Sequence, residues 1–186
     1  MPVIKTDFPD LLIIEPVIFG DDRGYFFEAY NEKTLSSENV NINFIQDNQA
    51  KSVYGVVRGL HYQDNPYAQT KLIRVLDGVI WDVVVDLRKN SPSFGKVFTI
   101  ELTSQNKKQL LVPKGFAHGY SVLSETAEVF YKCDEFYHKE CEGAVIYNDP
   151  LLLIDWKVPK EKMILSAKDV ASPLFENSVH KFLFEG

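Results

Sequence analysis

An arginine, a histidine and a glutamine stand at the end of a largely apolar stretch, in the segment Arg58-Gly59-Leu60-His61-Tyr62-Gln63. Lys71 begins a second apolar stretch, which is rich in branched residues. Charged groups on a strand that faces a core cost free energy unless they are paired or have a task. A histidine titrates near neutral pH and can accept a proton, and a lysine in a water-poor site can stabilise developing negative charge. These residue types therefore favour proton-transfer chemistry.

Strand parity places three reactive side chains inside the protein. Side chains alternate between the two faces of a strand, and three expected strands each carry one of these residues on the apolar face: His61, Lys71 and Tyr131. Each has a structural interpretation, since inward tyrosines are commonly hydrogen-bonded core residues and a strand histidine is often structural. Lysine, however, is almost never fully buried unless it is paired. The three together predict a polar pocket.

Arg58 has the opposite parity to His61. Either Arg58 faces outward, or a bulge at Gly59 turns both side chains inward, and we predict the bulge. Asp82 lies on the face opposite Trp81. Parity leaves two possibilities for Asp82, a second acid in a mixed pocket or a solvent-facing side chain.

Many short strands separated by Gly, Pro, Asn and Asp turns must position these residues, which predicts an all-β antiparallel sandwich or barrel. The Asp77-Gly78 dipeptide predicts a hairpin turn between two of them, and short helices are expected near Asn31 and at 167–170. The strands are expected within residues 11–19, 25–30, 43–52, 54–63, 71–76, 79–87, 94–103, 107–112, 126–133 and 143–148. We expect a single domain over 1–186, with 1–50 as an N-terminal arm and 165–186 as a C-terminal tail.

The composition limits the class of protein. A chain of 186 residues with 45% hydrophobic and 25% charged residues suits one soluble domain. The net charge of -6 argues against nucleic acid as a partner. The two cysteines, Cys133 and Cys141, are expected as free thiols in a reducing cytoplasm. The sequence shows no signal peptide and no apolar run of membrane-spanning length, so no membrane is expected as a partner.

The segment from Pro113 to His118 matches the Pro-x-Gly-x-x-His part of the second cupin motif. Cupins are double-stranded jelly rolls, which agrees with the expected strands. The first motif of a metal-binding cupin has His-x-His, but here the matching region is His61-Tyr62-Gln63, with one histidine only. One imidazole from each motif makes a poor site for zinc or iron, and we predict that no metal is bound.

Within the cupins, the sequence closely resembles the dTDP-4-dehydrorhamnose 3,5-epimerases, in order and with family-like spacing from about residue 15 to 170. The matching segments are Gly20 to Glu28, Gln46-Asp47-Asn48, Arg58 to Gln63, Pro66 to Leu72, Asp86-Leu87-Arg88, Ser91 to Gly95, Pro113 to Gly119, Tyr131-Lys132, Asp149-Pro150 and Leu165 to Asp169.

The resemblance implies four catalytic residues. His61 would be the general base, Asp169 its carboxylate partner, Tyr131 the acid on the other face of the sugar, and Lys71 the cation beside the 4-keto oxygen. It also implies nucleotide-sugar contacts from Arg23, Phe26, Glu28, Gln46, Asn48, Arg58, His118, Tyr137, Glu142 and Lys168. Because the family's segment with Arg23, Phe26 and Glu28 reaches the neighbouring subunit's site, a homodimer is implied, and no cofactor is.

The expected function is therefore epimerisation at C3 and C5 of dTDP-4-dehydro-6-deoxy-D-glucose in dTDP-L-rhamnose biosynthesis. Three alternatives stand beside it: an epimerase acting at one carbon only, a non-catalytic cupin that binds a sugar or a protein, and a metal-dependent cupin. A binding module needs no opposed acid and base, and the single histidine of the first motif argues against the metal enzyme.

Overall fold

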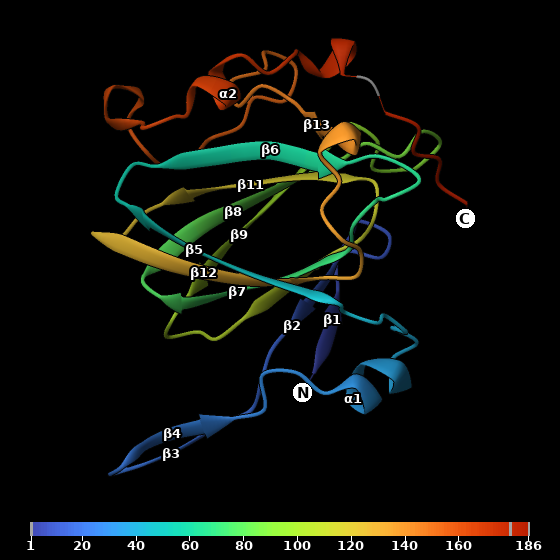
Figure 1. Ribbon diagram of the computed structural model, residues 1–186. Helices are drawn as coiled ribbons and strands as arrows, with labels where there is room; N and C mark the ends of the chain where they lie inside the picture. The colour runs from blue at the N-terminus through green and yellow to red at the C-terminus, as the bar shows by residue number, and fades with distance from the viewer. Residues whose placement is uncertain (1, 179, 186) are drawn as a thin grey trace.

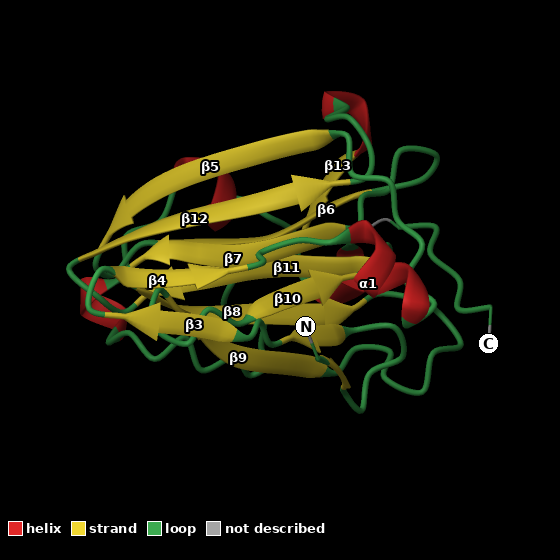
Figure 2. Ribbon diagram, turned by 90° about the horizontal axis from the view of Figure 1, so that it is seen from below, coloured by secondary structure: helices red, strands yellow, loops and turns green. Residues whose placement is uncertain are grey.

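Two antiparallel sheets face each other in the computed structural model, which describes residues 2–178 and 180–185 (Figure 1). The six-stranded sheet has the order β1 (Val3–Lys5), β2 (Leu12–Ile14), β10 (Gln109–Val112), β7 (Lys71–Asp77), β12 (Thr126–Cys133), β5 (Gln46–Val53). The five-stranded sheet has the order β13 (Glu142–Ala144), β6 (Val57–Gln63), β11 (Phe116–Val122), β8 (Val79–Asp86), β9 (Val97–Thr103). Figure 2 shows β5, β12 and β7 side by side. The all-β jelly roll expected from the sequence is confirmed.

The main core lies between the sheets, where inward apolar residues such as Ile73, Val84 and Leu110 are fully buried. A second cluster lies on the other face of the five-stranded sheet, where Val83 and Val85 pack with Trp156 of the C-terminal part of the chain. The β8 strand is therefore buried on both faces, which explains its nearly continuous run of apolar residues.

Short helices lie at the periphery. The helix α1 (Glu32–Ser37) begins after Asn31, whose side chain caps it by accepting from two backbone N–H groups. The helix α2 (Ala167–Val170) is capped by Ser166, whose hydroxyl accepts from one backbone N–H group, that of Asp169. Both helices are where the sequence predicts them. Single turns of 3₁₀ helix occur at Lys139–Cys141, Lys160–Lys162 and Phe175–Asn177.

The predicted hairpin across Asp77-Gly78 is wrong. The strands β7 and β8 that flank it belong to different sheets, so the chain crosses between layers at this turn. Gly78 has φ +81, and a Cβ added there would lie 2.1 Å from the carbonyl oxygen of Thr126, so the crossing needs glycine. A turn dipeptide indicates a change of direction, but it does not indicate which sheet the next strand joins.

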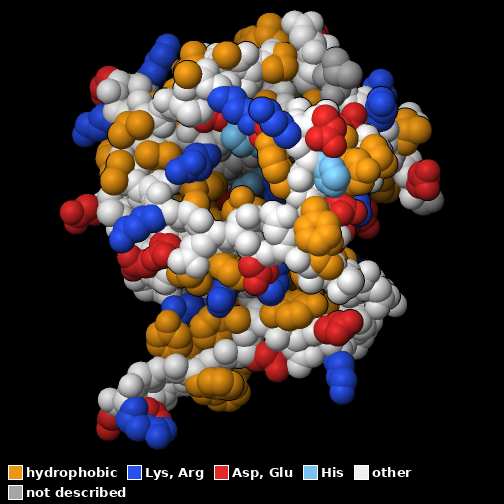
Figure 3. Space-filling model, in the orientation of Figure 1, with side chains coloured by type: hydrophobic (Ala, Val, Ile, Leu, Met, Phe, Trp, Pro, Cys, Tyr) orange, Lys and Arg blue, Asp and Glu red, His pale blue; other side chains and the backbone are white. Residues whose placement is uncertain are grey.

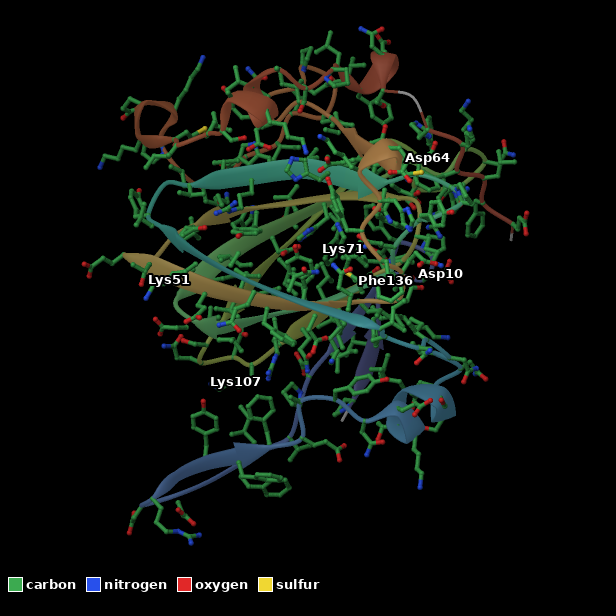
Figure 4. All side chains as sticks on the ribbon, viewed as in Figure 1. Asp10, Lys51, Asp64, Lys71, Lys107 and Phe136 are labelled. Atoms are coloured by element: carbon green, nitrogen blue, oxygen red, sulfur yellow. The ribbon has the colours of Figure 1, made fainter. Side chains whose placement is uncertain are left out.

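A two-stranded hairpin, β3 (Ile18–Asp21) with β4 (Gly24–Phe27), projects away from the two sheets (Figure 1). Its aromatic side chains are unusually exposed: Phe19 is 63% and Phe26 is 70% accessible. Lys107 makes one link to the body, since its ammonium donates to the Tyr25 hydroxyl at 2.8 Å (Figure 4). Exposed aromatic clusters of this kind mark interaction surfaces.

Candidate active site

A hollow of about 370 Å³ opens between the two sheets. It is lined by Gln46, Asn48, His61, Tyr62, Gln63, Gln69, Lys71, Tyr131, Tyr137 and Glu142. Figure 3 shows histidine side chains deep in a hollow of the visible face, beneath a group of Lys and Arg side chains. A larger hollow of about 520 Å³, near the turn between β1 and β2, contains none of the residues predicted for the site. The pocket between the sheets is the candidate active site.

His61 forms a pair with a carboxylate from the far end of the chain. Its Nε2 lies 2.7 Å from Oδ1 of Asp169, which leaves Nδ1 as the ring nitrogen available for proton transfer. Ser166 holds the same carboxylate by donating its hydroxyl to Oδ2 at 2.6 Å, and the Gly59 N–H lies 3.4 Å from Oδ1. Because α2 begins at Ser166, the capping residue of the helix also orients the carboxylate.

The carboxylate of Asp169 stays charged at neutral pH. Burial would raise its pKa, but the hydrogen bonds from His61 and Ser166 outweigh burial and lower the pKa to about 2. A fixed negative charge at Nε2 sets the orientation of the imidazole and supports its charged form after proton uptake, as the aspartate of a hydrolase triad does.

The bulge predicted at Gly59 is confirmed. His61 pairs with His118 and Arg58 pairs with Tyr120, so two residues of β6 face the single Gly119 of β11. Gly59 has φ +117, and a Cβ there would lie 2.5 Å from the Cα of Gly119. The bulge also turns Arg58 toward the facing sheet, where Nε and Nη2 lie 3.2 and 3.1 Å from Oγ of Ser52 on β5.

Lys71 and Tyr131 enter the pocket from the six-stranded sheet. Lys71 lies between the two sheets (Figure 4), and its ammonium makes no hydrogen bond or ion pair with any described residue. Burial lowers the pKa of this ammonium, while Cys133, Asp82 and Glu142 oppose the shift. Burial raises the pKa of the Tyr131 phenol, so Tyr131 is protonated at neutral pH and can act as an acid. His61 and Tyr131 thus come from facing sheets.

Asp82 is a buried acid of this region that the sequence left undecided. Its side chain is fully buried, and Oδ2 lies 2.8 Å from Nε2 of His118 on the neighbouring strand. Burial raises the pKa of Asp82, and His118 and Lys71 oppose the rise. The shared parity of Asp82 with the buried Ile80 and Val84 was the signal for this placement.

Hydrogen bonds and an ion pair bring together several side chains that the sequence predicts as contacts at the mouth of the pocket. Tyr137 donates its hydroxyl to Glu142 at 3.0 Å, and Lys168 contacts the other oxygen of the same carboxylate. The Tyr137 backbone N–H lies 3.1 Å from the Gln46 side-chain oxygen, and Gln46 donates to Asn48 at 3.2 Å. Arg58 on β6 and His118 on β11 do not line this pocket: Arg58 is exposed and bonds to Ser52, and His118 pairs with Asp82.

Three further predicted contacts lie on or just after the projecting hairpin, away from this pocket. Arg23 and Phe26 belong to the projecting hairpin and line a separate shallow hollow there. Glu28, just after the hairpin, accepts from the Asn31 amide at 2.9 Å. Within one subunit, therefore, these three residues do not join the site.

Among residues 2–178 and 180–185, no group of three or more His, Cys, Asp and Glu side chains is placed to hold a metal ion. The absence of a metal from the working enzyme stays a prediction. No helix in the same residues is long and apolar enough to cross a membrane.

A jelly roll that holds a histidine of one sheet against a helix carboxylate, with a protonated tyrosine on the facing sheet, has the arrangement of an acid–base enzyme of the cupin class. The family model for dTDP-4-dehydrorhamnose 3,5-epimerase matches residues 5–177. The dTDP-4-dehydrorhamnose 3,5-epimerase of Shigella flexneri is 48% identical, over 94% of this chain and 96% of its own length. The chain belongs to the dTDP-4-dehydrorhamnose 3,5-epimerase family.

Solved structures of the family agree with the fold. The enzyme from Elizabethkingia anophelis is 54% identical with a TM-score of 0.91, covering 95% of this chain and 97% of its own. The enzyme from Legionella pneumophila, solved in complex with dTDP-4-keto-L-rhamnose, is 44% identical with a TM-score of 0.90, covering 95% and 93%. The resemblance stated from the sequence motifs is thereby confirmed.

Proposed function

We propose that the protein inverts C3 and C5 of dTDP-4-dehydro-6-deoxy-D-glucose and so forms dTDP-4-dehydro-L-rhamnose for dTDP-L-rhamnose biosynthesis. The observation that carries the proposal is the placement of His61 and Tyr131 on facing sheets of one pocket, which Lys71 also lines. Inversion requires a base and an acid on opposite sides of the sugar ring. A buried ammonium stabilises the enolate that lies between the two half-reactions.

The steps follow from the acidity of the carbons next to the ketone. Nδ1 of His61 removes the proton, and Asp169 stabilises the resulting imidazolium. The electron pair moves onto the 4-keto oxygen, beside Lys71. Tyr131 then gives its phenolic proton to the opposite face of the carbon. None of these steps uses a redox cofactor or a metal, and we propose that the enzyme works without either.

The nucleotide part of the substrate binds at the mouth in this proposal. Lys168 is 56% exposed at the side chain and can exchange its contact with Glu142 for a phosphate oxygen. Gln46, Asn48 and Tyr137 offer amide and hydroxyl groups to the sugar and the base. We assign the remaining predicted contacts with the nucleotide sugar to Arg58 on β6 and His118 on β11.

We also propose a homodimer in which the hairpin β3–β4 enters the neighbouring subunit's site. The support is that Arg23, Phe26 and Glu28 lie outside the pocket of their own chain, while the hairpin exposes its aromatic residues to solvent. A symmetric dimer would cover these residues and add the arginine to a diphosphate site.

We propose a cytoplasmic enzyme whose residues 1–186 form one cupin domain. The free thiols of Cys133 and Cys141 agree with a reducing compartment. The C-terminal part of the chain packs on the five-stranded sheet and supplies Asp169 to the site, which supports treating the whole as one unit.

Solvent exchange tests the proposal. In deuterium oxide, the wild-type protein is expected to introduce deuterium at both C3 and C5 of dTDP-4-dehydro-6-deoxy-D-glucose, as read by NMR. His61→Asn should abolish exchange at both carbons, and Tyr131→Phe should leave exchange without inversion. Tyr147→Phe, which removes a phenol oxygen on the outer side of the five-stranded sheet, serves as the control and should behave as wild type.

Exchange at a single carbon by the wild-type protein would select the one-carbon epimerase instead. No exchange at either carbon, with the nucleotide sugar still bound, would favour the binding module and contradict the proposal. Full activity of His61→Asn would contradict the assigned base.

A further inference from the structure

Two inversions on one bound sugar require the acid and the base to return to their starting protonation states between the two steps. Each inversion moves a proton from the sugar to His61 and another from Tyr131 to the sugar. Before the second inversion, His61 must lose its proton and Tyr131 must regain one, while the sugar still fills the pocket and limits the access of water to Tyr131. The inference below rests on the proposed function and concerns the source of that proton.

Tyr120 is a buried phenol that the proposed steps do not use. It lies on β11 opposite Arg58 of β6 and Asp82 of β8, and it is only 5% exposed. It belongs to the core cluster between the sheets, against which Tyr131 packs from the facing sheet. The two phenols therefore occupy the same interior, one on each sheet.

The hydroxyl of Tyr120 has polar neighbours but is not satisfied by them. Ser52 and Arg58 are its neighbours, yet within the described part of the chain no hydrogen bond of good geometry reaches the buried oxygen. A buried polar atom without a partner costs free energy. Phenylalanine would fill the same space without that cost, so packing alone does not account for the hydroxyl.

Arg58 connects this buried oxygen to the solvent. Its side chain is exposed on one side and bonds to Ser52 on the other, with contacts of 3.2 and 3.1 Å. Burial raises the pKa of both Tyr120 and Tyr131, and the charge of Arg58 opposes that rise for both phenols. A phenolate on either tyrosine is thus stabilised by one guanidinium.

We propose that Tyr120 is a proton relay that restores Tyr131 between the two inversions. The Tyr131 phenolate takes the proton of the Tyr120 hydroxyl, directly or across one bound water. The O–H bond of Tyr120 breaks as that of Tyr131 forms, and the negative charge passes to Tyr120. Water then returns a proton to Tyr120 by way of the Ser52 hydroxyl and leaves hydroxide at the exposed side of Arg58. The His61 imidazolium, whose side chain is 31% exposed, releases to solvent the proton that it took from the sugar, and this proton neutralises the hydroxide.

The test is a single-turnover experiment with Tyr120→Phe and enzyme in excess, in which the singly and the doubly inverted sugars are counted. The first inversion is expected to keep its rate, because Tyr131 starts with its own proton. The second should slow by on the order of tenfold or more, so that the singly inverted sugar accumulates. Ser52→Ala should shift the ratio in the same direction but less.

Stability provides a second readout. Tyr120→Phe should unfold in urea at the same concentration as wild type or at a higher one, because an unsatisfied oxygen is removed. Tyr147→Phe is the matched control and should keep the wild-type product ratio. A Tyr120→Phe enzyme with the wild-type product ratio would overturn the relay, and so would one that loses both inversions equally. Full inversion by Tyr131→Phe would instead overturn the proposed function.

Discussion

The Asp169 carboxylate shows how one residue is made ready for chemistry by its hydrogen bonds. It receives the His61 imidazole and the Ser166 hydroxyl while it is almost entirely buried. Burial alone would raise the pKa of Asp169 and favour the neutral acid, but the hydrogen bonds from His61 and Ser166 stabilise the charged carboxylate. The same bonds that orient the His61 imidazole therefore also stabilise the fold.

Asp169→Asn is expected to reduce the free energy of unfolding at pH 7 by about 2 kcal/mol, because the pKa falls from 3.8 to about 2 on folding. The pKa is lowered in the folded state, so this stabilisation is present above about pH 4 and is lost as the pH falls through 2. Urea unfolding of both proteins between pH 7 and pH 2 measures the difference, which should shrink across that range.

Asp155→Asn is the matched control, since Asp155 pairs with Lys157 at an exposed position. It should change the stability little at any pH. A difference between wild type and Asp169→Asn that did not depend on pH would show that the loss comes from packing and not from the charge.

At the scale of residues, strand parity predicted the positions of His61, Lys71 and Tyr131 correctly, because inward residues on short strands have only two possible faces. Parity also predicted the bulge at Gly59, after which Arg58 reaches Ser52 of the facing sheet but stays exposed and outside the pocket lining. Parity could not show whether Asp82 is buried or exposed. A carboxylate on a mixed face is buried only if a residue of a neighbouring strand pairs with it. The histidine that pairs with it lies on another strand.

At the scale of elements, the crossing from β7 to β8 matters most. It places Lys71 at the start of a strand in one sheet and Asp82 on a strand in the other. The sequence predicted both strands within a residue or two, but it gave a hairpin where the chain changes layers. The residues of a turn show that the chain reverses its direction. The sheet that the next strand joins depends instead on which apolar strand faces still need to be buried.

Gly78→Ala should destabilise the protein by about 1–3 kcal/mol from the backbone conformation alone, and further through the close approach to Thr126. The urea midpoint measures this loss. Gly20→Ala is the control, because a Cβ at Gly20 meets nothing closer than 3.7 Å and should leave the midpoint nearly unchanged. Equal midpoints for the two variants would mean that the crossing tolerates a side chain.

At the scale of the whole molecule, the hairpin β3–β4 is the part that a single subunit does not explain. The sequence indicated an arm because aromatic residues there had to be covered by something. It could not show which residues of the arm leave their own pocket, since that depends on the direction of the hairpin relative to the sheets. The structure places Arg23 and Phe26 well away from His61.

A mixing experiment checks the proposed exchange of arms. Arg23→Ala and His61→Asn should each have low activity alone. Mixed and allowed to exchange subunits, they should recover up to about a quarter of the wild-type activity, because half of the dimers then hold one intact site. If native mass spectrometry shows mixed dimers but no activity returns, the arginine does not act in the neighbouring subunit's site.

The pairing of His61 with Asp169 also has a consequence for the order in which the enzyme becomes competent. The histidine is synthesised early, within the strands that build the two sheets, and the carboxylate arrives much later, after all of those strands. During translation, a nascent chain can therefore close its jelly roll around a pocket whose base has no orienting partner. If His61 and Asp169 act as proposed, we expect activity to begin only after α2 has left the ribosome and Asp169 has reached His61.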